Sequence, residues 1–532
     1  MSTARLVGLS AVAVALVVSA PGMSRPSSAQ APPAPRVAQT GSDFNSDGFD
    51  DLPVAAPEED VEPLIDSGAV HVLYGTAEGL SGGSGQVWTQ DSPGVPGVAE
   101  SNEEFGRALA SGDFDGDGFS DLAVGTPGED DEGLGTTDSG AVNVLYGSAE
   151  GVTAAGAQYF TQDTPGVRDR VESFDQFGEG LGAADFNGDG FADLAVGAWG
   201  EGVGTVSSAG AVEVLYGSPA GLQATAPDDQ FWNQDSPGVI DSAEDYDDFG
   251  YRMAAADFDG DGLADLAVGV PDEWVGSAKE AGAANVLYGS PAGLTALGNQ
   301  FWNQDSPGIL DRAETEDVFS LSMAAGDMNG DGAADLAVGV PLDDVSGKFD
   351  GGGINVLYGS STGLVADGNQ FWTQDSPGIL ESTGYYDEFG WALTVRDYDG
   401  DGFADLAASA DGEIIPHALY AGGVNVLYGT PSGLGADRNQ FWTQNSPGIL
   451  DTAEESDYFG EAMSSGDFNG DGAGDLAVGV PWEDLQALED AGAVNVLFGA
   501  TGGLSAVGNQ FWDQDSPGVG DVAEAGDEFG WV

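Results

Sequence analysis

The chain has 532 residues, no cysteine, 12 Lys and Arg against 90 Asp and Glu, and a formal net charge of −78. This charge excludes a nucleic-acid or anionic-membrane binder, and the lack of cysteine excludes disulfides and thiolate metal sites. Because 41% of the residues are apolar, with 11 Trp, 14 Tyr and 25 Phe, the acidic chain still has enough apolar surface for a packed core.

The N-terminal segment has the layout of a secretory signal peptide. One basic residue precedes an apolar run over 6–18, and small residues follow. We therefore expect a signal peptide over 1–31, cleaved after Ala20 or Ala31, a linker over 32–42, and a secreted, extracellular mature protein. A membrane anchor is the alternative, although the run is short for a spanning helix. No later segment is apolar for long enough to cross a bilayer, so we expect no membrane span in the mature chain.

From residue 43 onward one acidic segment recurs seven times. The first copy reads DFNSDGFDDLPVAAP and the second DFDGDGFSDLAVGTP. Successive copies begin 70 or 72 residues apart, which indicates a repeat architecture rather than several unrelated domains. The copies begin at Asp43, Asp113, Asp185, Asp257, Asp327, Asp397 and Asp467.

Each repeat contains four short segments in a fixed order. An aromatic-Gly pair with a short run comes first, as in FGRALA from Phe105, and the acidic loop then leads into DLAVG. The third segment resembles GAVNVLYG from Gly140, and the fourth QFWTQDSPG from Gln370. Segments of this length, rich in Val, Leu and aromatic residues and bounded by Gly, Pro, Asp or Ser, are typical of strands between turns. Four strands in each of seven repeats predict an all-β fold over 43–532, a seven-bladed β-propeller of four-stranded blades.

The first and fourth segments suggest how the blades pack. We place the Phe-Gly pairs on inner strands, where the aromatic ring fills the space between blades and Gly allows close backbone approach. The Trp of the fourth segment, such as Trp302, is expected to pack between blades rather than to stack on sugars. After the seventh repeat, Phe529-Gly530 begins the first segment again. Residues 529–532 either complete the first blade and remove its sheet edge, or begin an eighth repeat that is cut short.

The acidic loop has the ligand pattern of a calcium site. Side-chain oxygens stand at positions 1, 3, 5 and 9, a backbone carbonyl is available at position 7, and Gly at position 6 allows a sharp turn. Each pair of close carboxylates repels by about 4 kcal/mol at an effective dielectric of about 20, and a divalent ion reverses this sign. Position 12 is Val124 in the second copy, not the Glu of an EF-hand. Asp-rich turns that satisfy only their own backbone are the alternative.

We expect up to seven calcium ions, one for each loop, and we predict no other metal, no organic cofactor and no catalytic residue. The residue at position 3 alternates between Asn and Asp along the chain, so neighbouring sites differ in charge. The candidate ligands, at positions 1, 3, 5, 7 and 9, are Asp43, Asn45, Asp47, Phe49, Asp51; Asp113, Asp115, Asp117, Phe119, Asp121; Asp185, Asn187, Asp189, Phe191, Asp193; Asp257, Asp259, Asp261, Leu263, Asp265; Asp327, Asn329, Asp331, Ala333, Asp335; Asp397, Asp399, Asp401, Phe403, Asp405; and Asp467, Asn469, Asp471, Ala473, Asp475.

The combined pattern FG…DxNGDGxxDLxVGxP resembles the FG-GAP repeat of the integrin α-subunit head and of many bacterial secreted proteins. The resemblance covers nearly all of the chain beyond residue 43. It implies a seven-bladed propeller with calcium in the turn between the first and second strands of a blade, and ligand binding on the opposite face. The further extracellular domains and membrane helix of an integrin subunit do not occur in this sequence, so the resemblance does not imply receptor signalling.

Two functions compete. The complete set of acidic loops and the varied loops expected on the opposite face favour a secreted adhesion or interaction module, with an extracellular protein or glycan as its partner. The alternative is a secreted calcium-dependent hydrolase or lyase, because propellers support many chemistries. Only two histidines are present: His71, in a strand position filled by Asn in other repeats, and His417, in an irregular insertion. No pair of carboxylates is singled out for glycoside hydrolysis, so we expect no enzyme activity.

Overall fold

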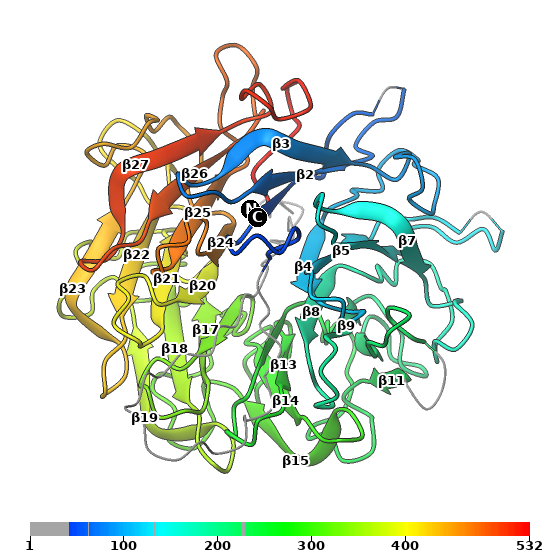
Figure 1. Cartoon of the computed structure of the whole chain (residues 1–532). Helices are drawn as coiled ribbons and strands as arrows, with labels where there is room; N and C mark the ends of the chain where they lie inside the picture. Colours follow the sequence, from blue (N-terminus) through cyan, green and yellow to red (C-terminus); the bar gives the residue numbers. More distant parts are fainter. Residues whose placement is uncertain (1–41, 62, 132, 225–228) are drawn as a thin grey trace, which may run out of the picture.

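The structure, a computed structural model, describes residues 42–61, 63–131, 133–224 and 229–532. Within these residues all regular structure is strand, and seven antiparallel sheets are arranged in a ring (Figure 1). The predicted fold, a seven-bladed β-propeller, is confirmed. The expected signal peptide over 1–31 and nearly all of the expected linker lie outside the described residues. Among the described residues no helix is long and apolar enough to span a membrane.

Each blade is a sheet of consecutive strands. The first strand of the blade lies nearest the centre of the ring and the last lies at the rim, as β24 to β27 show in Figure 1. Blade 1 contains β1 (Leu52–Ala56), β2 (Ala69–Tyr74) and β3 (Ser81–Trp88); blade 2, β4 (Ala108–Gly112), β5 (Asp121–Thr126), β6 (Ala141–Tyr146) and β7 (Thr153–Phe160); blade 3, β8 (Gly180–Ala184), β9 (Asp193–Ala198), β10 (Ala211–Leu215) and β11 (Asp229–Trp232); blade 4, β12 (Met253–Ala256), β13 (Asp265–Val270), β14 (Ala283–Tyr288) and β15 (Thr295–Trp302); blade 5, β16 (Met323–Gly326), β17 (Asp335–Val340), β18 (Gly353–Tyr358) and β19 (Val365–Trp372); blade 6, β20 (Leu393–Arg396), β21 (Asp405–Ala410), β22 (Gly423–Tyr428) and β23 (Gly435–Trp442); and blade 7, β24 (Met463–Gly466), β25 (Asp475–Val480), β26 (Ala493–Phe498) and β27 (Ser505–Trp512).

The sequence of each strand matches its depth in the blade. The second and third strands, such as β13 and β14, are buried along their whole length, and they are nearly continuous apolar runs because neighbouring blades cover both faces. The outer strand β15 is mostly half-buried at the rim, with two adjacent exposed residues, Leu297 and Gly298. It begins five residues before the predicted Gln-Phe-Trp segment, because Thr295 pairs with Tyr288 of the third strand beyond a shift in register.

The Phe-Gly pairs lie just before the inner strands rather than within them, which corrects our placement. Phe105 and Gly106 precede β4, and Phe105 is fully buried against Val54 and Val70 of blade 1. Gly106 adopts a φ of +105°, and a Cβ there would lie 2.9 Å from the Ala55 side chain. The pair therefore turns the chain into the strand while its ring packs between two blades, as expected.

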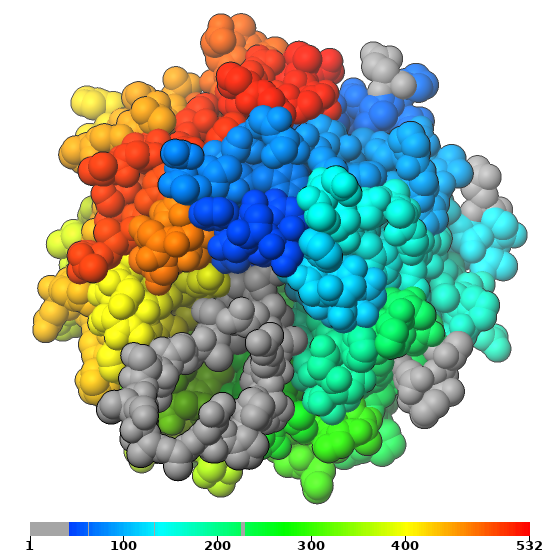
Figure 2. Space-filling view, in the orientation of Figure 1, coloured from blue at the N-terminus to red at the C-terminus, as the bar shows by residue number. Residues whose placement is uncertain are grey.

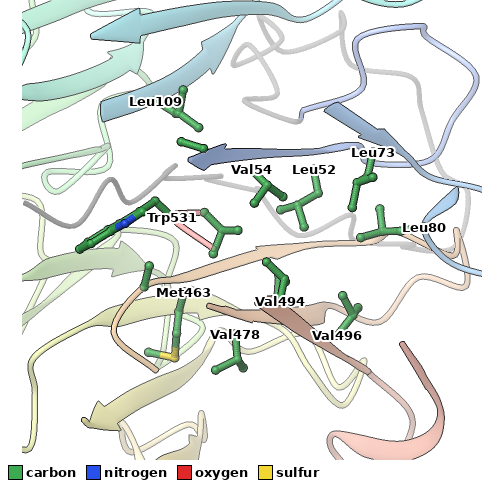
Figure 3. Packing of buried hydrophobic residues seen from close by; sticks show 14 of the residues in the cluster. Leu52, Val54, Leu73, Leu80, Leu109, Met463, Val478, Val494, Val496 and Trp531 are labelled. Carbon is green, nitrogen blue, oxygen red and sulfur yellow. The ribbon is translucent and has the colours of Figure 1, made fainter. Parts of the chain in front are cut away.

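The core consists of apolar layers between neighbouring blades. Trp302 is partly buried and packs against the layer shared by blades 4 and 5, in agreement with the expected packing role. The largest cluster joins blades 1, 2, 6 and 7, and Figure 3 shows Val54 of β1 facing Val494 of β26, with Trp531 at one end. Because every blade supplies one wall of two such layers, no blade buries its apolar strands alone.

A glutamine clasp joins each blade to the next. The side-chain amide of the Gln in Gln-Phe-Trp donates to a backbone carbonyl on the following blade at 2.9 to 3.0 Å. Blade 7 meets blade 1 in the same way, and Figure 2 shows the orange and red end of the chain against its blue beginning. The seven contacts are Gln86 to Val152, Gln158 to Leu222, Gln230 to Leu294, Gln300 to Leu364, Gln370 to Leu434, Gln440 to Leu504 and Gln510 to Leu80.

The last residues of the chain lie against the inner edge of blade 1. The Ala55 N–H donates to the Trp531 carbonyl at 2.7 Å, and the Ala55 carbonyl accepts from Gly530 and Trp531 at 3.2 Å. Trp531 is fully buried. Residues 530–531 thus occupy the place that an inner strand has in the other blades.

Strand alternation divides the connections between two faces. The acidic turns share one face, the turn face, with the turns joining third and fourth strands. The opposite connection face contains the connections between second and third strands, such as 271–282, and those between blades, such as 233–252. The acidic turns and the long variable loops are therefore separated by the length of a strand.

Candidate metal centres

The seven acidic turns lie where the sequence places them, between the first and second strands of blades 2 to 7 and immediately before β1 in blade 1. In the turn of blade 4, both oxygens of Asp257 at position 1 accept backbone hydrogen bonds, from Asp261 at 3.0 Å and Gly262 at 2.8 Å. The Leu263 N–H donates to Asp261 Oδ1 at 3.0 Å. Gly262 has a φ of +95°, a conformation that favours glycine. The local sequence therefore curls the turn around its own carboxylates.

The carboxylate at position 9 is the most buried ligand. Asp265 is 1% exposed and accepts from the N–H groups of Phe258 and Gly289, each at 2.8 Å. Burial raises the pKa of Asp265 to about 8, with further raising by Asp259 and Asp257, although the backbone hydrogen bonds act in the opposite direction. Such a group strongly favours a positive neighbour or a proton. The same contacts recur at position 9 of every turn, through Asp51, Asp121, Asp193, Asp335, Asp405 and Asp475.

Three turns bring carboxylates at positions 1, 3 and 9 together, with one oxygen of each within 4.8 Å of the others. These are the turns with Asp at position 3. The carboxylate at position 5 is not part of these groups, and its Oδ1 accepts the N–H of position 7 instead. The structure thus assembles three of the predicted side-chain ligands and leaves the fourth at the rim of the turn. The three groups are Asp113, Asp115, Asp121; Asp257, Asp259, Asp265; and Asp397, Asp399, Asp405.

Two of the four turns with Asn at position 3, those of blades 5 and 7, compensate the charge differently. Asn329 Nδ2 donates to Asp335 Oδ1 at 3.3 Å, and Asn469 makes the same contact with Asp475. The amide thereby places a donor where the Asp turns place another negative charge. Turns of lower and higher charge therefore alternate from blade 1 to blade 7, and the alternation is broken where the Asn turns of blades 7 and 1 are neighbours in the ring.

Blade 6 has a cationic side chain at its turn. Arg438, from the outer strand β23, lies 2.5 Å from Asp399 and 3.8 Å from Asp401. Its guanidinium, on a side chain 48% exposed, partly neutralises the site that a cation would occupy. This contact was not predicted, because Arg438 is far from the turn along the chain.

Backbone hydrogen bonds join the seven turns into a closed ring. The carbonyl at position 1 of each turn accepts the N–H of position 8 in the next turn, at 2.7 to 3.2 Å. Each turn is therefore held by hydrogen bonds to the turns on either side of it. The donor and acceptor pairs are Asp50 and Asp467, Ser120 and Asp43, Ala192 and Asp113, Ala264 and Asp185, Ala334 and Asp257, Ala404 and Asp327, and Gly474 and Asp397.

The residues of the turns fit a hard divalent cation. Carboxylate and amide oxygens are the ligands that calcium prefers, and in three turns position 9 presents a buried carboxylate beside two others. Outside blade 6, none of the described Lys, Arg or His side chains forms an ion pair with positions 1, 3, 5 or 9. Hydrogen bonds within the turn would also form without a metal, so the fit rests on the uncompensated charge rather than on the curl of the loop.

Comparison with known proteins agrees with this architecture. The chain is 34% identical over 188 residues to rat phosphatidylinositol-glycan-specific phospholipase D. The matched segment covers 35% of this chain and 21% of the relative. The human protein of that name is 29% identical, and the match covers 70% of this chain and 42% of the human protein. Integrin alpha-PS2 of Drosophila melanogaster is 30% identical, and the match covers 49% of this chain and 17% of the integrin. The chain thus spans less than half the length of these relatives.

Among solved structures, an exotype rhamnogalacturonan lyase aligns over 77% of this chain and 57% of its own, with 13% identity and a TM-score of 0.36. Sequences of the FG-GAP repeat match once in every blade, over 34–73, 105–145, 177–215, 249–284, 319–356, 389–427 and 459–497. With one match for each blade and an acidic turn in each, the chain belongs to the FG-GAP repeat family.

Proposed function

We propose that this chain is a secreted, calcium-stabilised interaction module that binds an extracellular protein or glycan through its connection face. Calcium at the acidic turns would fix the positions of the blades, and the connections on the opposite face would contact the ligand. The family membership supports this proposal, because integrin α subunits are among the relatives. The apolar N-terminal run supports secretion.

The distribution of exposed apolar side chains is the observation that carries the proposal. In the described part of the chain, all strongly exposed large apolar side chains except Leu297 and Val507 lie in connections of the connection face. Trp274 is 49% exposed and lies 4.4 Å below the ammonium of Lys279, and Tyr385 has a similar contact with a lysine. Exposed aromatic residues gathered on one surface mark interaction sites.

A binding assay with matched variants tests this proposal. The chain would be presented, in calcium and in chelator, to immobilised collagen, fibronectin and neutral polysaccharides. For any partner bound, Trp274→Ala with Tyr246→Ala is expected to weaken binding at least tenfold, because both side chains are on the connection face. Leu297→Ala with Val507→Ala, which alters two exposed rim residues, is the control and should bind like the wild type. Equal loss in both variants, or none in either, would contradict the proposed surface.

The proposal describes a module without catalytic activity. His71 is 1% exposed in β2, with its ring 5.1 Å from that of Phe529, whereas His417 is exposed in the connection between β21 and β22. This separation supports no acid–base pair. Turnover of an ester or polysaccharide substrate in the presence of calcium would replace this proposal with the hydrolase or lyase alternative.

A further inference from the structure

A second kind of acidic cluster lies on the connection face, between blades 3 and 4. Glu244 and Asp247 come from the connection that joins β11 to β12, and Glu273 from the connection that joins β13 to β14. One carboxylate oxygen of each residue lies within 4.8 Å of the other two. Asp247 and Glu273 are 1% and 2% exposed, whereas Glu244 faces solvent. The cluster is therefore buried on one side and accessible from the other.

Gln234 adds a neutral oxygen at this cluster. The residue lies just beyond the end of β11 and is 1% exposed. Its Nε2 donates to Glu273 at 2.8 Å, which holds the amide against the carboxylates, but its Oε1 has no hydrogen-bond partner among the described residues. A buried polar oxygen without a partner is unfavourable, because it has lost its hydrogen bonds to water. This oxygen lacks a hydrogen-bond donor or a cation, and the observation does not depend on the carboxylates; the equivalent oxygens of the other six blades are unpaired as well, so only the carboxylates distinguish this junction.

The surrounding protein does not supply that partner. No described Lys, Arg or His side chain forms an ion pair with Glu244, Asp247 or Glu273. Burial, and then the neighbouring carboxylates, raise the pKa of Asp247 to about 7 and that of Glu273 to about 8. Each of these two carboxyl groups therefore favours a proton or a bound cation over an isolated negative charge.

We propose that Gln234, Glu244, Asp247 and Glu273 form a calcium site that links blade 3 to blade 4. Three carboxylates and an amide oxygen form an all-oxygen ligand set suited to calcium. Gln234 follows the outer strand of blade 3, and Glu273 belongs to blade 4, so one ion would connect both blades on the face opposite the acidic turns. This site is separate from the turns, and it does not depend on a ligand bound to the connection face.

The contact between glutamine and carboxylate recurs around the ring. Gln90 donates to Glu129 at 2.6 Å, and Gln514 donates to Glu59 at 2.5 Å, where blade 7 meets blade 1. The sequence also contains two natural exceptions. Gly384 occupies the place of Glu244 between blades 5 and 6. Between blades 4 and 5 the shorter Asp343 replaces Glu273, and no hydrogen bond joins it to the local glutamine. These two junctions are expected to bind calcium least.

Anomalous scattering from crystals grown with manganese, a stand-in for calcium, tests the site directly. The full chain is expected to give a peak within ligand distance of Gln234 Oε1 and the three carboxylates, together with peaks in the acidic turns. Glu244→Gln with Asp247→Asn, which preserves side-chain shape, should remove the junction peak and leave the turn peaks. Peaks in the turns alone would overturn the junction site, whereas a junction peak without turn peaks would contradict calcium at the turns instead.

A stability measurement separates metal binding from a purely structural role. In chelator, Glu244→Gln with Asp247→Asn should be at least as stable as the wild type, because like charges are removed. In calcium the variant should gain less in Tm than the wild type and retain one fewer ion per chain by equilibrium dialysis. Asp367→Asn with Glu78→Gln removes the same charge at exposed positions and should behave as the wild type. Equal calcium retention by the two double variants, or a variant that is less stable in chelator as well, would overturn the proposal.

Discussion

Asp265 Oδ1 accepts a hydrogen bond from the backbone N–H of Gly289 at 2.8 Å, and this contact joins the acidic turn of blade 4 to the end of its third strand. The other oxygen accepts from Phe258, so this carboxylate has a structural role before any metal binds. A change at position 9 should therefore affect both folding and calcium affinity. A change at position 5 should affect mainly calcium affinity.

Two alanine variants in the same turn test this difference. Asp265→Ala leaves two buried N–H groups without an acceptor and is expected to lower the free energy of unfolding by about 2 to 4 kcal/mol in chelator. Asp261→Ala, at an exposed position, should cost less than about 1 kcal/mol under the same conditions. Urea denaturation in chelator gives both values. Equal losses would show that position 9 has no special structural role.

Removal of calcium should lower the stability of the whole ring. Each turn is expected to add roughly 1 to 2 kcal/mol at millimolar calcium, because extracellular calcium modules bind near 10⁻⁴ to 10⁻³ M. Since hydrogen bonds connect all seven turns, we expect one cooperative transition that shifts to lower temperature in chelator and returns when calcium is restored. Calorimetry in both conditions measures this shift. An unchanged Tm would contradict occupied turns.

Arg438 should weaken calcium binding at blade 6. Its contact with Asp399 has to be replaced when a cation enters, and an ion pair with a half-exposed arginine contributes about 1 kcal/mol. Arg438→Gln is therefore expected to raise the calcium affinity of this turn roughly three- to fivefold. Site occupancy from anomalous scattering at subsaturating calcium measures the change. Arg312→Gln, at an exposed arginine of the connection face, serves as the control and should leave all turns unaltered.

His71 makes the fold sensitive to acid in a predictable direction. Burial lowers the pKa of His71 from 6.5 to about 4, so the unfolded chain binds this proton more tightly. The contribution of His71 is fully present above pH 6.5 and is lost as the pH falls towards 4, by about 3 kcal/mol. His71→Asn, the residue found in this strand position in most other blades, should remove this loss. The measurement is the unfolding free energy of the variant and of the wild type between pH 4 and 7. His417→Asn, which replaces an exposed histidine, is the control.

Gly197 sets the distance between blades 3 and 4. A Cβ at this residue would lie 2.1 Å from the carbonyl oxygen of Gly250, so the backbone must move to accommodate it. Gly197→Ala is expected to destabilise the chain by about 1 to 3 kcal/mol. Gly502→Ala is the matched control, since nothing lies within 4 Å of a Cβ there, and should change stability by less than about 0.5 kcal/mol. Thermal denaturation of the two variants should separate them clearly.

The amino-acid sequence determined the blades and the acidic turns because both are local. Asp257, Asp259 and Asp265 lie within nine residues, so the turn itself brings them together, and the strand on either side is set by its own apolar pattern. The placement of Phe105 within the inner strand was wrong. Its ring is buried as predicted, but β4 begins only at Ala108, and that boundary depends on the pairing of β4 with β5.

Only the tertiary structure decided which distant residues meet. Gln510 and Leu80 are 430 residues apart, and their contact exists because the seventh blade returns to the first. Gln234 and Glu273 come from different blades, and neither residue alone differs from an ordinary surface side chain in the sequence. Local spacing fixes a turn, whereas burial, unpaired oxygens and like charges brought together from separate blades arise only when the ring is assembled.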